Sequence, residues 1–343
     1  MQVENIKHLV LSGGGMLGIS YIGLVKYLEE KLPNPIKNNL QSITCCSAGA
    51  IFGTLIAIGY TYNEMITIVK NMNFKEYINV NAESIINFMK LKGLESGKIF
   101  INFIKKCIKD KLGNEDITFR EIKAKFNIEL QIGVTNLTKS TFELMNSINT
   151  PDIPVHKAIS ASIAIPFVFE PIVIGNDVFC DGGILNNLPI ENLIISNNLH
   201  KEKMEENKEN TKEEKKEDTP NTKEDIPSTK EDTPSTKENS AIIIEPPNIL
   251  AIYLLTNTNV ITKDNYQSIS IAQYLNSVMH SLSHEFVYNK INVNNMLNKT
   301  SEKCKIIIYN IPCDIMTFLK INSSHEDINN IIQIAYNTTK ESF

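Results

Sequence analysis

Three short segments of this chain carry residues whose types suit acyl-transfer chemistry. The first holds Gly13, Gly14 and Gly15 in succession, the second holds Ser47, and the third holds Asp181. Each segment follows an apolar run typical of a β-strand, so folding can bring all three to one edge of a sheet. A serine hydroxyl becomes a nucleophile when a base removes its proton, and glycine amides can stabilise the oxyanion that forms. The three segments together indicate acyl transfer.

The glycine-rich turn is suited to bind a negatively charged oxygen. Successive glycines expose their amide groups without side chains that block an approach. Apolar residues then recur at helical spacing until Pro33: Leu17, Tyr21, Leu24, Val25, Leu28 and Leu32. The turn is therefore expected to open a helix, whose positive end also favours an anion.

The same turn fits a second interpretation, because Gly13, Gly15 and Gly18 also satisfy the dinucleotide fingerprint G-x-G-x-x-G. That motif alone is weak evidence. A nucleotide-binding unit needs an acidic residue at the end of its second strand to hold the ribose hydroxyls. Here the second strand, residues 43–46, is followed by Ser47. The sequence thus disfavours nucleotide binding.

Ser47 lies between a strand-like run and an uncharged helix-like run over residues 48–58. A serine on a sharp strand-to-helix turn projects its hydroxyl from the backbone, and its neighbours must be small because the turn is crowded. Gly49 meets this need, whereas Cys45 stands where the usual G-x-S-x-G elbow has glycine. We interpret that departure as a source of strain or of reduced activity. Ser47 could also be an ordinary helix cap.

Two further stretches complete a pattern: the run from Ser162 to Phe169 reads S-x-A-I-P-x-x-F, and the run from Asp181 to Pro189 reads D-G-G-x-x-x-N-x-P. With these motifs the chain resembles the patatin-like phospholipases, whose signature adds G-G-G-x-x-G and G-x-S-x-G. All four motifs occur in order, and only the leading glycine of the elbow is missing. The resemblance covers residues 6–200 and, more weakly, the part that follows residue 240.

The resemblance implies Ser47 as the nucleophile, Asp181 as the general base and residues 13–15 as the oxyanion hole. Supporting motif glycines are Gly18, Gly49, Gly182 and Gly183. It implies a lipid acyl hydrolase of the phospholipase A or lysophospholipase type, which acts through an acyl-enzyme and needs no histidine, metal or cofactor. Transfer of the acyl group to another alcohol, and a weakened relative that only binds lipid, remain alternatives.

The order of elements predicts the fold class. Strand-like runs at residues 7–11, 43–46, 130–134, 249–255 and 305–311 alternate with helix-like runs. Such alternation predicts a three-layer α/β/α sandwich around a mostly parallel sheet, with the site at the carboxyl ends of the strands. The family resemblance implies the same architecture.

Residues 201–240 interrupt this pattern. Their only apolar side chains besides proline are Met204 and Ile226, and a seven-residue repeat places proline where a continuous helix would break. We therefore predict one catalytic domain, residues 1–200 plus 241–343, with a disordered and charged insertion. Its 9 Lys and 13 Asp and Glu give −4, which leaves −1 of the chain's net charge of −5 for the rest.

The segment 89–111 contains seven lysines and an apolar helical face. It suits peripheral contact with anionic lipid, although an ordinary amphipathic helix packed on the sheet explains the same pattern. Nucleic-acid binding is not expected, because Arg120 is the only arginine.

No signal peptide or membrane-spanning run is evident, and six cysteines in such a chain fit a reducing compartment. We therefore expect an intracellular, cytoplasmic protein that contacts membranes peripherally. His280 and His284 have a spacing that can bind zinc but lack the acidic base of H-E-x-x-H, so no metal site is predicted.

Overall fold

The computed structural model describes residues 1–32, 35–72, 88–192, 248–256, 304–311 and 325–343. Met1–Ile190 and Pro247–Phe343 form one unit, which holds all the elements described below, and Glu191–Pro246 form another. The predicted insertion, residues 201–240, and the histidines at 280 and 284 lie outside the described residues. The predicted domain organisation therefore stays a prediction.

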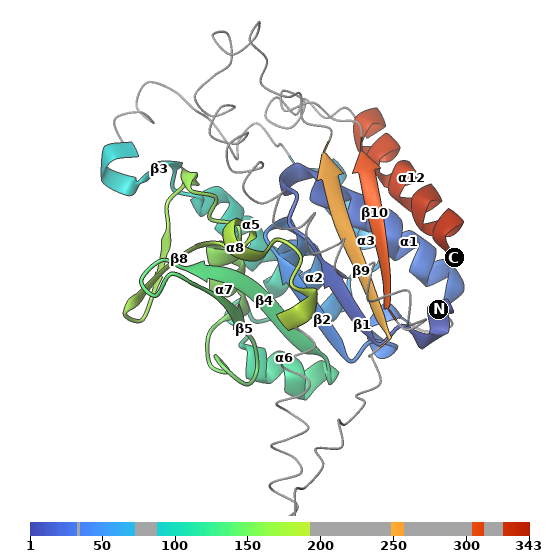
Figure 1. Cartoon of the computed structure of the whole chain (residues 1–343), viewed down its shortest axis with the longest axis horizontal. Coiled ribbons are helices and arrows are strands. Elements are labelled where there is room, and N and C mark those ends of the chain that lie inside the picture. Colours follow the sequence, from blue (N-terminus) through green and yellow to red (C-terminus); the bar gives the residue numbers. More distant parts are fainter. Residues whose placement is uncertain (33–34, 73–87, 193–247, 257–303, 312–324) are drawn as a thin grey trace, which may run out of the picture. The chain divides into compact units, whose positions relative to one another are not determined.

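An eight-stranded sheet runs through the described part of the first unit in the order β10-β9-β1-β2-β4-β8-β7, with β5 also paired to β4 (Figure 1). Its strands are β1 (His8–Leu11), β2 (Ser42–Cys46), β4 (Glu129–Asn136), β5 (Thr141–Met145), β7 (Ile172–Ile174), β8 (Asp177–Asp181), β9 (Ile249–Thr256) and β10 (Cys304–Ile311). Two short strands, β3 (Gly93–Glu95) and β6 (Phe167–Phe169), pair separately.

The five strands predicted from the sequence form a continuous parallel block. β10, β9, β1, β2 and β4 pair in parallel with their neighbours. Every residue of β1 and β2 is buried, including the polar His8, Ser42 and Thr44, so both faces of these central strands are covered.

The remaining strands make the sheet mixed. β5 and β8 both run antiparallel to β4, and β7 runs antiparallel to β8. The short connection between β7 and β8 is a hairpin, and a hairpin can only join antiparallel strands. Asp181 ends β8, so the third catalytic turn follows a strand as expected, but this strand runs antiparallel to β4 and lies outside the parallel block.

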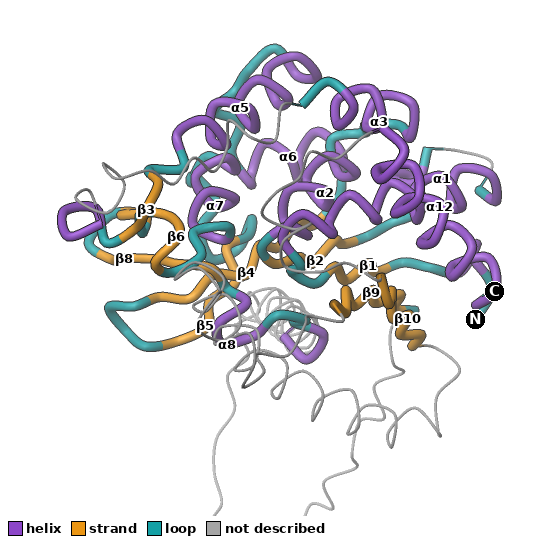
Figure 2. Tube along the Cα trace, turned by 90° about the horizontal axis from the view of Figure 1, so that it is seen from above, coloured by secondary structure: helices purple, strands orange, loops and turns teal. Residues whose placement is uncertain are grey.

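Most described helices lie on one face of the sheet (Figure 2). They are α1 (Tyr21–Lys31), α2 (Ala48–Ala57), α3 (Tyr62–Lys70), α5 (Lys98–Leu112), α6 (Phe119–Phe126), α7 (Val155–Ser162) and α12 (His325–Ser342). The short α8 (Gly183–Asn186) lies on the other face. The core fills the space between this helical layer and the sheet. The structure shows an α/β fold, and the third layer stays a prediction.

Candidate active site

Ser47 occupies a tight turn between the last residue of β2 and the first residue of α2. Its backbone has φ 51° and ψ −125°, a conformation that L-residues rarely adopt. Strained backbone of this kind costs about 1–3 kcal/mol and persists where the surrounding structure enforces it. The turn directs the side chain of Ser47 away from the strand and toward β8, where it meets a carboxylate.

Asp181 is buried and accepts two hydrogen bonds. The hydroxyl of Ser47 donates to Oδ2 at 2.5 Å, and the backbone N–H of Gly183 donates to Oδ1 at 2.7 Å. Burial raises the pKa of the Asp181 carboxyl to about 7, and these two hydrogen bonds act in the opposite direction. A carboxylate with this pKa is a much stronger base than an exposed aspartate, whose pKa is roughly 4.

The register of β4 explains how residues so distant in sequence meet. Cys46, the last residue of β2, pairs with Gly133 of β4, and Asp181 pairs with the next residue, Val134. The last residues of β2 and of β8 therefore pair with neighbouring residues of β4, although β2 runs parallel to β4 and β8 runs antiparallel to it. The hydroxyl of Thr135 also donates to the carbonyl oxygen of Asp181 at 2.9 Å. The antiparallel direction of β8 is thus what brings the carboxylate beside the serine.

The glycine-rich turn lies against the same serine. A Cβ on Gly13 would sit only 2.7 Å from Cβ of Ser47, so this position tolerates no side chain. The N–H of Gly13 donates to the carbonyl of Asn187 at 3.2 Å. The N–H groups of Gly14 and Gly15 have no acceptor among the described residues. Two of the three predicted amides therefore remain available, whereas the Gly13 amide is engaged within the protein.

The other motif glycines permit close packing around the site. A Cβ on Gly49 would lie 2.5 Å from the carbonyl oxygen of Leu11, and one on Gly182 would lie 2.4 Å from that of Gly133. Gly18 similarly contacts Ala48, and Gly183 lies beside the Asp181 carboxylate. These contacts hold the three turns together.

Ser162, the last residue of α7, supports the nucleophile turn, a role that the sequence analysis did not assign. Its hydroxyl accepts from the N–H of Ser47 at 2.8 Å and donates to the carbonyl of Gly133 at 2.6 Å. Ser162 therefore links the strained turn at Ser47 to β4 through two hydrogen bonds. The signal was present, since Ser162 is the first residue of the S-x-A-I-P motif, but the motif does not reveal which backbone group it contacts.

Cys45 fits its position because α2 carries a glycine opposite it. The Cys45 side chain is buried, and a Cβ on Gly53 would lie 3.0 Å from its Sγ. Burial raises the pKa of the neighbouring Cys46 thiol well above its usual value, so this thiol stays neutral beside Asp181. The cysteine at the missing glycine position is accommodated without displacing Ser47 from Asp181.

The apolar face of α5 points into the protein. Ile104, Cys107 and Ile108 are buried in the core, whereas Ile99 at the start of the helix is exposed. For most of its length α5 therefore follows the ordinary amphipathic interpretation. Among the described residues no group of three potential metal ligands occurs. No helix in the described part of the chain is both long enough and apolar enough to span a membrane.

The chain belongs to the patatin-like phospholipase family, whose model matches residues 9–194. This range contains the glycine-rich turn, Ser47 and Asp181.

Curated relatives are similar over about half of the chain. The uncharacterized protein R571 of Acanthamoeba polyphaga mimivirus is 30% identical over 187 residues, which cover 54% of this chain and 61% of that protein. The probable lipid hydrolase 463L of Invertebrate iridescent virus 6 is 29% identical over 203 residues, or 58% and 67% of the two chains. Triacylglycerol lipase 5 of Saccharomyces cerevisiae is 28% identical, covering 54% of this chain and 27% of the lipase.

Among solved structures, VipD from Legionella pneumophila is similar with a TM-score of 0.48 and 17% identity. The match covers 98% of this chain and 66% of that one.

Proposed function

We propose that this protein hydrolyses fatty-acyl esters of lipids, as a phospholipase A or lysophospholipase would, with Ser47 and Asp181 as a catalytic dyad. The observation that carries the proposal is the 2.5 Å hydrogen bond from the Ser47 hydroxyl to a buried carboxylate. Membership of the patatin-like family supports it, as does similarity to proteins named as lipases or lipid hydrolases.

The geometry suggests how acylation proceeds. Oδ2 of Asp181 takes the hydroxyl proton while Oγ of Ser47 bonds to the ester carbonyl carbon. The carbonyl π electrons move onto the oxygen, and the free amides of Gly14 and Gly15 stabilise that oxyanion. When the oxyanion collapses, the bond to the alcohol oxygen breaks, and the alcohol leaves with the proton held by Asp181.

Deacylation repeats these steps with water. Asp181 takes a proton from water, the hydroxide oxygen attacks the acyl-enzyme carbonyl, and Ser47 leaves with the proton from Asp181. If another alcohol takes the place of water, the product is a new ester. We infer that hydrolysis is the main outcome, and analysis of products formed in the presence of glycerol distinguishes it from acyl transfer.

The dyad predicts a sharp loss of activity when either member is removed. We expect Ser47→Ala and Asp181→Asn each to reduce turnover of a chromogenic medium-chain ester by roughly 10³-fold or more. Asp177→Asn is the matched control, because Asp177 lies on the same strand and pairs with Lys139. All variants should keep a cooperative thermal transition.

Covalent labelling separates catalysis from simple lipid binding. A fluorophosphonate should label Ser47 in the unmodified protein, slowly in Asp181→Asn and not at all in Ser47→Ala, because the adduct requires an activated hydroxyl. Full turnover in either dyad variant, or an unlabelled wild-type protein, would contradict the proposal.

A further inference from the structure

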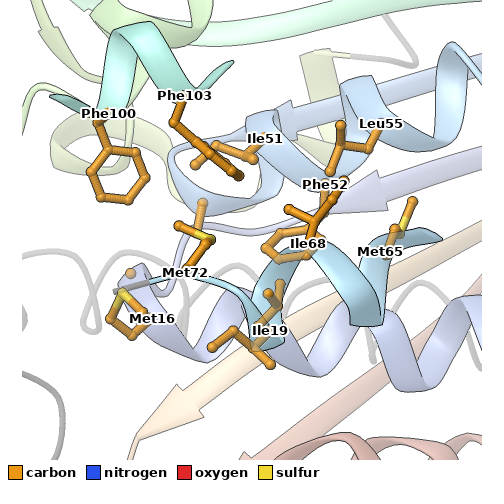
Figure 3. Close-up of a pocket in the computed structure, with 13 residues that line it drawn as sticks. Met16, Ile19, Ile51, Phe52, Leu55, Met65, Ile68, Met72, Phe100 and Phe103 are labelled. Atoms are coloured by element: carbon orange, nitrogen blue, oxygen red, sulfur yellow. The ribbon is translucent and has the colours of Figure 1, made fainter. Parts of the chain in front are cut away.

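An apolar cavity begins beside the two catalytic turns (Figure 3). One end is lined by Gly15 and Met16, which continue the glycine-rich turn, and by Ala48, which follows Ser47 directly. The space amounts to about 480 Å³ when the open mouth is counted.

The lining chemistry excludes a polar ligand. All thirteen lining residues are glycine, alanine or residues with larger apolar side chains. Water needs polar partners to be held in a cavity, so this space favours an apolar occupant. Met16, Met65 and Met72 contribute flexible thioether side chains that adapt to the shape of a bound hydrocarbon.

The direction of the cavity follows from α2. Ala48, Ile51, Phe52 and Leu55 line it and recur at intervals of three to four residues, so they share one face of the helix. A helix rises about 1.5 Å per residue, which places Leu55 roughly 12 Å from the nucleophile. Figure 3 shows Leu55 and Met65 together at the end away from Met16. The cavity thus extends away from Ser47 for about the length of a medium acyl chain.

We propose that this cavity holds the acyl chain of the substrate ester, and that Leu55 and Met65 at its far end set the preferred chain length. The proposal rests on the function proposed above, because it assigns the acyl rather than the alcohol part of the ester to this side of Ser47. Both side chains belong to the core, and Met65 is fully buried, so together they close the far end of the cavity.

Fatty-acid binding tests the cavity without requiring turnover. Decanoate and myristate are titrated calorimetrically into Ser47→Ala protein, alone or with a second substitution. We expect Leu55→Phe, which shortens the cavity, to weaken decanoate binding about tenfold. We expect Met65→Ala, which lengthens it, to improve myristate relative to decanoate by roughly fivefold. Ile148→Phe adds similar bulk at an exposed position and should change neither affinity.

Misfolding would weaken binding in Leu55→Phe, but a misfolded Met65→Ala protein cannot gain affinity for myristate. The two variants together therefore distinguish a change in cavity length from a loss of the fold. Equal decanoate affinity in Leu55→Phe and its parent, with an unchanged chain-length preference in Met65→Ala, would overturn the proposal. Loss of ester turnover alone concerns the dyad and not the cavity, because these titrations use protein that already lacks the nucleophile. A wild-type protein that binds decanoate but hydrolyses no ester would therefore retain the cavity and lose the proposed function.

Discussion

Asp181 is the residue whose environment most affects the proposed chemistry. Its carboxylate receives hydrogen bonds from Ser47 and Gly183, but the loss of water around it outweighs them and raises its pKa to about 7. The general base must be ionised to accept a proton. At neutral pH the Asp181 carboxyl is therefore divided about evenly between its ionised and protonated forms. A general base is most effective when its pKa lies near the working pH.

This pKa predicts a rising pH profile. We expect kcat/KM for a chromogenic ester to rise about tenfold per pH unit below pH 7 and to level off above it, because the fraction of ionised Asp181 follows that course. Initial rates in buffers of constant ionic strength measure the profile. An activity that is flat between pH 5 and pH 8 would rule out Asp181 as the titrating base.

The same shift has a consequence for stability. Below pH 4 Asp181 is neutral in the folded and unfolded states, whereas between about pH 4 and pH 7 only the unfolded chain releases its proton. Its contribution to stability is thus present at low pH and lost as the pH rises through 7. The Asp181→Asn variant lacks the ionisable group, so we expect it to raise the Tm by roughly five degrees more at pH 8 than at pH 4. This measurement checks the pKa shift independently of activity.

The packing of α2 against β1 determines where the nucleophile lies. At Gly49 the helix approaches the strand so closely that a Cβ would meet two backbone carbonyl oxygens, those of Leu11 at 2.5 Å and Ser12 at 2.7 Å. At Gly53, one turn further on, a Cβ would meet only side-chain atoms, the nearest 3.0 Å away. Backbone atoms of a buried strand cannot move aside as the ends of side chains do.

These two glycines provide a matched comparison within one helix. We expect Gly49→Ala to lower the free energy of unfolding by roughly 2–3 kcal/mol, because overpacking against the strand backbone outweighs the better helix propensity of alanine. Gly53→Ala should change it by about 1 kcal/mol or less, since the two effects nearly offset. Urea unfolding measures both. A similar cost at the two positions would show that contact with the backbone of β1 is not the cause.

The proposed substrate is a lipid ester, and such esters are presented in aggregates; we propose that residues 89–111 supply part of the contact with that lipid surface. The apolar face of α5 is buried, but Met89 and Ile99 are exposed by 74% and 50% of their surface. Phe167 of β6, 41% exposed, pairs with Gly93 of β3, and its ring lies tilted against that of Phe88. Exposed lysines flank these side chains, namely Lys90, Lys92 and Lys98.

We expect the protein to sediment with vesicles that contain anionic lipid and less with neutral vesicles, because the lysines add electrostatic attraction. Replacing Met89, Ile99 and Phe167 by aspartate should reduce the bound fraction about tenfold. Ile148→Asp, at an exposed apolar position elsewhere, serves as the control. If the control loses as much binding as the triple variant, this patch is not the contact site.

Much of the secondary structure could be predicted from the sequence, because it depends mainly on the residue types within each segment. The five parallel strands, the helix after Ser47 and the family followed from apolar runs, glycine spacing and motif order. The strands β5 and β7 were missed because short runs with partial exposure lack a clear period. A strand before Asp181 was expected, but its antiparallel direction was not. The pairing of Ser162 with the amide of Ser47 was missed because 115 residues separate them.

Sequence alone thus determined which residues are chemically suited to the reaction, since side-chain type and backbone permissiveness belong to each residue. Only the tertiary structure decided their relative placement. β8 runs antiparallel to β4, and this direction carries Asp181 to Ser47 and removes it from water. The fold also engages the Gly13 amide, whereas those of Gly14 and Gly15 meet no acceptor within the described part of the chain. Distances and desolvation depend on contacts between distant segments, and no local pattern encodes them.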